Sequence, residues 1–127
     1  IKKNKDIPIL GICLGHQSIG QSYGGSIVQC KEIMHGKIDE IEHSGHELFK
    51  RVGKKFQATR YHSLILERES LPSNLEIIAE TKSKVIMGIA HKNKKIFGLQ
   101  FHPESIGTDS GKIILENFLS IIKYEYR

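Results

Sequence analysis

Apolar and polar positions near the start of the chain predict a strand, a tight turn and a helix. The apolar run from Ile7 to Leu10 has the length of a short buried strand, and a glycine-containing turn follows it. A segment of helical character then extends to about Tyr23. Gly24-Gly25 supplies a residue that can adopt positive φ and end this helix.

The middle of the chain is rich in runs of β-like residues. Six of them are expected to form strands: 26–30, 37–43, 55–61, 75–80, 85–91 and 96–101. Polar segments of hairpin length separate the last three. The run 37–43 alternates apolar and polar residues, which favours an edge strand.

Shorter connections and a final helix complete the pattern. A loop is expected at 31–37, a turn at 44–46 and a single helical turn at 47–50. The last helix is predicted from Gly111 to Lys123, with Asp109 or Ser110 as its N-cap. Its apolar stripe consists of Ile114, Leu115, Phe118, Leu119, Ile121 and Ile122. Helices at both ends and a β-rich middle favour an α/β fold in which helices cover a mixed sheet.

Composition narrows the class of protein without identifying a function. With 127 residues, 39% hydrophobic and 26% charged, the chain fits one globular domain with a core. It contains neither an apolar run near the roughly 20 residues of a membrane span nor a signal-peptide pattern. Cys13 and Cys30 form neither a close pair nor a ligand cluster, so an intracellular setting is expected. The net charge of +5 comes from scattered lysines without interleaved aromatic residues, which disfavours a nucleic-acid partner.

The turn Gly11-Ile12-Cys13-Leu14-Gly15 lies between the first predicted strand and helix, the position of a nucleophile elbow. Glycines let strand and helix approach closely, and the helix N-terminus favours a thiolate at Cys13. The backbone N–H of Leu14 is placed to donate to an oxyanion. A buried cysteine in a glycine-rich turn is the alternative, and the pentapeptide alone does not decide. The strand before it and the helix after it favour a catalytic cysteine.

A catalytic cysteine needs a base, and His102 is the strongest candidate. It follows the run 96–101, and strand ends in α/β proteins commonly carry site residues. Pro103 disfavours helical geometry at His102, so the segment is expected to be extended. Residues two apart then face one side, which lets Glu104 orient the imidazole. A solvated turn histidine beside a surface glutamate remains the alternative.

The other histidines are weaker candidates. His16 is expected to pack beside the elbow, and His62 has no acidic residue two positions away. The spacing of His43 and His46 could bind a metal, but polar loop histidines are the more common case. His35 and His91 fall in expected loops, and Cys30 is expected to be a half-buried strand residue.

Two motifs together, Gly11 to Gln17 and Phe101-His102-Pro103-Glu104-Ser105, resemble those of the class I (triad) glutamine amidotransferases. Within this family, three further segments are similar to the glutaminase subunits of anthranilate synthase and aminodeoxychorismate synthase: 34–37, 60–64 and 107–111. The resemblance covers residues 1–127. It implies a glutamine amidotransferase domain with a flavodoxin-like, largely parallel sheet flanked by helices, and it implies neither a cofactor nor a metal.

The resemblance also implies residue roles. Cys13 would attack the side-chain amide of L-glutamine, with the Leu14 N–H in the oxyanion hole. His102, oriented by Glu104, would protonate the departing ammonia and then activate water against the γ-glutamyl thioester. Gln17 matches a residue that contacts substrate glutamine, and the backbone of Ser63 and Leu64 matches the pair that binds its α-amino and carboxylate groups.

The family also implies a partner, a chorismate-binding synthase subunit that receives the ammonia. The loop 31–37 and the segment near His62 are the candidate docking face, with ordinary exposed loops as the alternative. The setting would be the cytoplasm, or the plastid stroma if the gene is organelle-encoded. The sequence does not separate an anthranilate from an aminodeoxychorismate product. A γ-glutamyl hydrolase and a non-catalytic module that binds a synthase also remain open.

The chain departs from the family at its beginning. Family members carry a glycine-proline-rich loop upstream of the elbow that supplies the second oxyanion donor, and the twelve residues before Cys13 contain none. We therefore expect that about a third of the domain is lacking at the N-terminus and that 1–127 is its C-terminal two-thirds. Since one lost oxyanion donor costs about 10²–10³ in rate, this chain alone is expected to be inactive or poorly folded.

Overall fold

A computed structural model describes residues 7–31, 37–105 and 107–125. The elements follow in the order β1 (Ile9–Ile12), α1 (Leu14–Ser22), β2 (Ile27–Gln29), β3 (Lys37–His43), the 3-10 turn η1 (Glu47–Phe49), β4 (Lys55–Arg60), β5 (Leu64–Leu66), the 3-10 turn η2 (Arg68–Ser70), β6 (Leu75–Thr81), β7 (Ile86–His91), β8 (Ile96–Leu99) and α2 (Gly111–Glu125). The predicted strands and helices are therefore all present in the described part of the chain. Of the predicted loop 31–37, residues 32–36 lie outside the described part.

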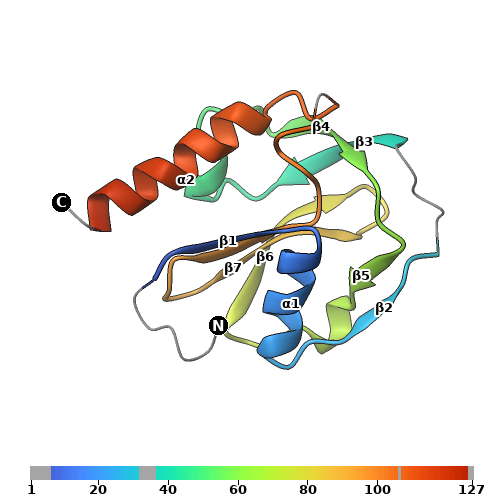
Figure 1. The fold of residues 1–127 in the computed structure, drawn as a ribbon. Helices are drawn as coiled ribbons and strands as arrows, with labels where there is room; N and C mark the ends of the chain where they lie inside the picture. Colours follow the sequence, from blue (N-terminus) through green and yellow to red (C-terminus); the bar gives the residue numbers. More distant parts are fainter. Residues whose placement is uncertain (1–6, 32–36, 106, 126–127) are drawn as a thin grey trace.

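The main sheet has the order β1-β8-β7-β6-β3-β4, and only β1 and β8 pair in parallel (Figure 1). The pairs β8–β7, β7–β6, β6–β3 and β3–β4 are antiparallel. The expectation of a largely parallel sheet is therefore wrong, whereas a mixed sheet is confirmed. Short hairpin connections join β6, β7 and β8, and such connections can only produce antiparallel neighbours.

The prediction that residues 37–43 form an edge strand is also wrong. β3 lies between β6 and β4, and β4 is at the edge. Ile41 on β3 is fully buried, while Ile38 is 60% exposed. The two are three residues apart, so they point to opposite faces of the strand.

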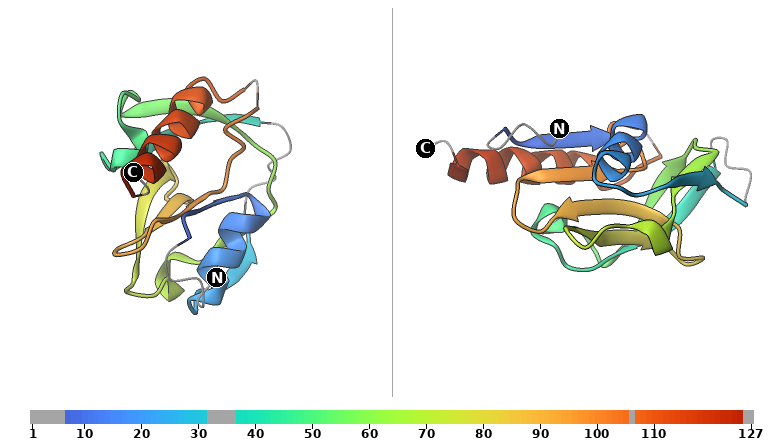
Figure 2. Two further views of the ribbon diagram at one scale, coloured as in Figure 1. Left: turned by 60° about the vertical axis from the view of Figure 1, so that its left-hand side comes forward. Right: turned by 90° about the horizontal axis from the view of Figure 1, so that it is seen from below.

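The sheet curls between two helices that cover opposite faces (Figure 2). Ile19 of α1 belongs to a cluster with Ile96 of β8, whereas Ile114 of α2 packs in a second cluster with Phe97 and Leu99. The alternation along β8 thus sends neighbouring side chains to different helices. The α/β arrangement with helices over a mixed sheet is confirmed.

A second, two-stranded sheet pairs β2 with β5 in antiparallel fashion. The sequence predicts no strand at β5, where the apolar run from Leu64 to Leu66 has only three residues. β5 lies beside α1 (Figure 1). Glycine at position 20 permits this approach, since a Cβ there would come within 2.4 Å of the Leu66 side chain.

The inward face of α2 is partly polar. Ile114 is fully buried, but Leu119 of the predicted stripe is 58% exposed, and Asn117 is buried instead. The Asn117 side chain donates to the carbonyls of Leu48 at 2.9 Å and Lys50 at 2.7 Å, so it ties α2 to η1. No helix in the described ranges is long and apolar enough to cross a membrane.

Candidate active site

Cys13 occupies a strained bend between β1 and α1. Its backbone has φ 53° and ψ −101°, a conformation that non-glycine residues rarely adopt. The Cys13 N–H donates to the Leu99 carbonyl at 2.8 Å. A Cβ at Gly11 would lie 2.6 Å from the Gly15 carbonyl carbon, so only glycine allows the strand and the helix to come this close. This is the elbow geometry that the sequence predicts.

The helix that follows presents its N-terminus at the bend. Leu14 is the first residue of α1, and the first N–H groups of a helix have no partner within it. Leu14 is 72% exposed, and Cys13 is partly exposed. Cys13 is therefore a partly exposed residue at the N-terminus of a helix, whereas structural cysteines are typically buried.

His102 and Glu104 form a pair just beyond β8. His102 Nδ1 lies 2.8 Å from Glu104 Oε2, so an Nδ1–H can donate to the carboxylate and leave Nε2 for other chemistry. Partial burial opposes ionisation of Glu104, but hydrogen bonds from its own backbone and from His102, together with the charge of His102, hold the pKa of Glu104 below its usual value. Thr108 Oγ1 donates to the His102 carbonyl at 2.9 Å and fixes the backbone.

The parallel pairing of β1 with β8 brings these groups to one edge of the sheet. Ile12 is opposite Leu99, so Cys13 and the segment that begins at Gln100 leave the sheet side by side. The Cys13 sulfur accepts from Gln100 Nε2 at 3.7 Å. Within the described ranges, no direct hydrogen bond joins the sulfur to the His102 imidazole.

Gln17 points inward and connects the elbow to the β5 segment. Gln17 is 4% exposed, and its Nε2 donates to the Leu64 carbonyl at 2.9 Å and to Gln100 Oε1 at 3.2 Å. The Ser63 carbonyl accepts from the Cys30 N–H at 2.8 Å. The structure therefore places the predicted residues Gln17 and Leu64 in contact with one another and, through Gln100, next to Cys13.

Gln100 and Arg60 are buried polar residues near the site that sequence reasoning missed. Gln100 is 1% exposed and Arg60 is fully buried. Arg60 Nη1 donates to Asp39 Oδ2 at 2.7 Å and its Nε donates to His62 Nε2 at 3.0 Å, directly before Ser63. For Gln100 the available signal was a polar residue directly after the apolar strand β8, whereas Arg60 ends a strand of mixed polar and apolar residues that gives no such signal.

His16 lies beneath the elbow rather than over the sulfur, as the sequence predicts. It is fully buried against Gly98, where a Cβ would meet His16 Nδ1 at 2.7 Å. Neither ring nitrogen makes a hydrogen bond of ordinary geometry. Burial lowers the pKa of His16 to about 4; the Gly98 backbone offsets part of this effect and nearby His62 adds to it.

His43 supports the loop that follows β3. Its Nε2 lies 3.1 Å from the Val52 carbonyl, its Nδ1 accepts from the Gly45 N–H, and its ring stacks on Phe49. Among the residues that the structure describes, no three metal-ligating side chains gather. The His43 ring is instead held by its contacts with the Val52 carbonyl, the Gly45 N–H and Phe49. Cys30 is buried, with its sulfur 3.8 Å from Arg60 Nη2.

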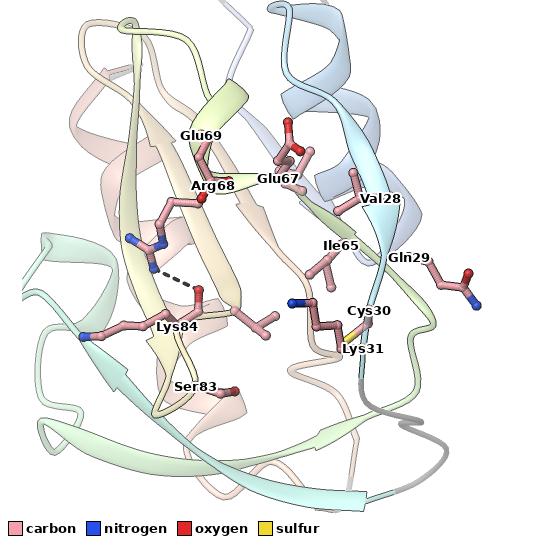
Figure 3. Close-up of a pocket in the computed structure, with 12 residues that line it drawn as sticks. Val28, Gln29, Cys30, Lys31, Ile65, Glu67, Arg68, Glu69, Ser83 and Lys84 are labelled. Carbon is pink, nitrogen blue, oxygen red and sulfur yellow. Dashed lines mark hydrogen bonds between the residues drawn. The ribbon is translucent and has the colours of Figure 1, made fainter.

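A cavity of about 690 Å³ lies between the β2–β5 sheet and the turn that joins β6 to β7 (Figure 3). Apolar side chains including Val28 and Ile65 line it, and charged residues surround it. Arg68, one of these, donates to the Lys84 carbonyl and to Glu80. Cys13, His102 and Glu104 do not line this cavity, so its size does not mark the candidate chemistry.

A family model described as glutamine amidotransferase class-I matches residues 1–122. Anthranilate synthase component 2 of Cyanophora paradoxa is 53% identical over 117 residues, which cover 91% of this chain and 62% of that protein. Aminodeoxychorismate/anthranilate synthase component 2 of Bacillus subtilis is 50% identical over 119 residues, which cover 94% of this chain and 61% of that one.

A solved structure is also similar to this chain. The crystal structure of a protein assigned to GMP synthase from Thermoplasma acidophilum superposes with a TM-score of 0.87 at 28% identity, over 94% of this chain and 59% of that one. The chain thus spans about three fifths of the length of each of these relatives.

Proposed function

Because the chain belongs to the class I glutamine amidotransferases, a family of enzymes, we propose that its gene product is the glutaminase component of an anthranilate synthase. Residues 1–127 form part of its amidotransferase domain. The observation that carries this proposal is the pairing of a strained cysteine elbow after β1 with a histidine–carboxylate pair after β8, the parallel neighbour of β1.

In the proposed reaction, Cys13 attacks the side-chain amide carbon of L-glutamine and forms a C–S bond. The oxygen that becomes negative is stabilised by the Leu14 N–H. His102 gives a proton to the departing nitrogen, and ammonia leaves as the C–N bond breaks. His102 then takes a proton from water, which attacks the thioester and releases glutamate and the Cys13 thiolate.

Glu104 acts through His102. Its hydrogen bond to Nδ1 keeps Nε2 available and stabilises the imidazolium that forms in the reaction. The lowered pKa of Glu104 agrees with this role, because, although partial burial opposes it, the hydrogen bond and charge of His102 favour the ionised carboxylate. We assign binding of substrate glutamine to the backbone of Ser63 and Leu64 and to Gln17.

The ammonia would pass to a chorismate-using synthase subunit, the proposed partner. Identities of about half to anthranilate synthase component 2 proteins support this assignment. The proposed docking face is the loop 31–37 and the segment near His62, where Tyr61 and Leu64 are exposed. We expect the complex in the cytoplasm, or in the plastid stroma for an organelle-encoded gene.

The glutaminase of aminodeoxychorismate synthase is the second candidate, because the Bacillus subtilis relative carries both names. The glutaminase does not itself bind the acceptor in either proposal. Co-expression with each kind of synthase, with product identified by mass, separates anthranilate from aminodeoxychorismate.

The test uses the full-length gene product with L-glutamine and assays for glutamate and ammonia. We expect hydrolysis that Cys13→Ser abolishes, and labelling of Cys13 by a glutamine-derived diazoketone. Cys30→Ser is the matched control and should retain both. Hydrolysis that survives in Cys13→Ser would contradict the proposal, and a folded protein whose Cys13 resists the label would favour a non-catalytic synthase-binding module.

A further inference from the structure

A line of amide groups connects the β5 segment to the nucleophile. Gln17 Nε2 donates to the Leu64 carbonyl at 2.9 Å and to Gln100 Oε1 at 3.2 Å. Gln100 Nε2 in turn lies 3.7 Å from the Cys13 sulfur, a normal distance for a bond to an atom larger than oxygen. The four groups come from α1, β5, the elbow and the segment after β8.

The direction of these bonds follows from one fixed acceptor. A backbone carbonyl can only accept, so the Gln17 group that faces Leu64 must be the NH₂. This NH₂ can only donate, so Gln100 must present its oxygen to it. The remaining group of Gln100, its own NH₂, therefore faces the Cys13 sulfur, and the sulfur can only accept from it.

Burial holds the two amides in this arrangement. Gln17 is 4% exposed and Gln100 is 1% exposed, so water competes little for their donors. The Gln100 N–H donates to the Met87 carbonyl at 2.9 Å and anchors the backbone to β7. A fixed donor aimed at sulfur stabilises the thiolate relative to the thiol, because hydrogen bonds to charged groups are stronger than those to neutral ones.

We propose that Gln100 is a further catalytic residue, which stabilises and aims the Cys13 thiolate through its side-chain N–H, and that Gln17 is a positioning residue that acts through Gln100. The catalytic part of this inference rests on the proposed function. The same line of bonds also reaches the Leu64 backbone, which is part of the proposed substrate-binding segment. Binding of glutamine there would therefore change the hydrogen bond that the Cys13 sulfur accepts from Gln100.

The test measures alkylation of Cys13 by iodoacetamide as a function of pH, with the Cys13 peptide quantified by mass spectrometry. Gln100→Met removes the donor without adding charge. We expect the midpoint of its rate–pH profile to move upward by about one pH unit, which is roughly a tenfold slower reaction below the midpoint. Gln100→Glu should move the midpoint further in the same direction. Gln21→Glu, on the exposed side of the same helix α1, is the control and should leave it unchanged.

A second variant covers the case in which Gln100→Met does not fold. Gln17→Glu keeps the shape of the side chain but cannot donate to Gln100, so it should also raise the midpoint. In assays of glutamine hydrolysis, Gln100→Met should lower kcat about tenfold at pH values below the wild-type midpoint, with little change in KM. Folded variants of Gln100 and Gln17 that keep the wild-type midpoint would overturn the inference, whatever their melting temperatures.

Failure of the inference and failure of the proposed function give different results, since alkylation needs no glutamine. A wild-type protein that leaves glutamine intact, but whose midpoint still rises in Gln100→Met, would refute the function and support the hydrogen bond. A wild-type protein that hydrolyses glutamine, together with an unchanged midpoint in Gln100→Met, would support the function and refute the role of the hydrogen bond.

Discussion

His16 should make the stability of the fold depend on pH. The ring is fully buried between α1 and β8, and burial lowers its pKa from 6.5 to about 4. The unfolded chain therefore binds a proton at this position near pH 6.5, whereas the folded chain excludes it until the pH is far lower. As the pH falls through this window, protons favour the unfolded state.

The size of the effect follows from the two pKa values of His16, folded and unfolded. A tenfold difference in proton affinity between the two states corresponds to about 1.4 kcal/mol, so the full loss is about 3 kcal/mol once the pH is below both pKa values. At pH 5 about 2 kcal/mol of it is already lost. The carboxyl groups of Glu80 and Glu104, whose pKa values are lowered, contribute with the same sign, but only below about pH 4.5, where they begin to take up protons.

Urea unfolding of the full-length gene product between pH 7 and pH 5 measures this directly. The wild type should lose about 2 kcal/mol more than His16→Leu, which fills a similar volume and cannot titrate. His91→Gln is the matched control: partial burial and Lys94 also lower the pKa of His91, but the half-buried ring should have a much smaller effect. An equal pH dependence in wild type and His16→Leu would refute the reasoning.

Three further substitutions test the packing around the site. Gly98→Ala should destabilise by about 1–3 kcal/mol, because the new Cβ would lie 2.7 Å from His16 Nδ1 and 3.1 Å from its Cα; an unchanged urea midpoint would contradict this contact. Asn117→Ala should cost about 1–3 kcal/mol by calorimetry, since two carbonyls between α2 and η1 lose their donor. Arg60→Met should cost about 1–3 kcal/mol and raise the KM for glutamine, because the side chain pairs with partly exposed Asp39 directly before the Ser63 segment. Substitution of Lys55, which is exposed on the same strand β4, should change neither the stability nor the KM for glutamine.

The parts of the site that sequence reasoning anticipated are local. The elbow needs only glycines at fixed positions between a strand and a helix, and Cys13 lies at a tight bend between β1 and α1, with φ 53°. The His102–Glu104 pair was predicted from an extended segment, and that part of the prediction is wrong. Pro103 and Glu104 form a turn in which the Ser105 N–H donates to the His102 carbonyl at 3.1 Å, yet the His102–Glu104 hydrogen bond at 2.8 Å is present.

The parts that sequence reasoning missed depend on which strands are neighbours. The pattern of apolar and polar residues within β3 does not show that β3 lies between β6 and β4. The short connections between β6, β7 and β8 make these strands antiparallel, contrary to the expectation of a largely parallel sheet. Arg60 is buried because pairing of β3 with β4 brings Asp39 to it. Gln100 acquires its partners only when α1 packs against the end of β8.

At Cys13, the stability of the fold and the proposed chemistry favour different residues. An L-residue held there stores roughly 1–3 kcal/mol that the rest of the domain must offset. Glycine would relax the backbone and erase the sulfur in the same step. Replacement of Cys13 by glycine should therefore raise the stability of the fold while removing the sulfur that the proposed chemistry requires.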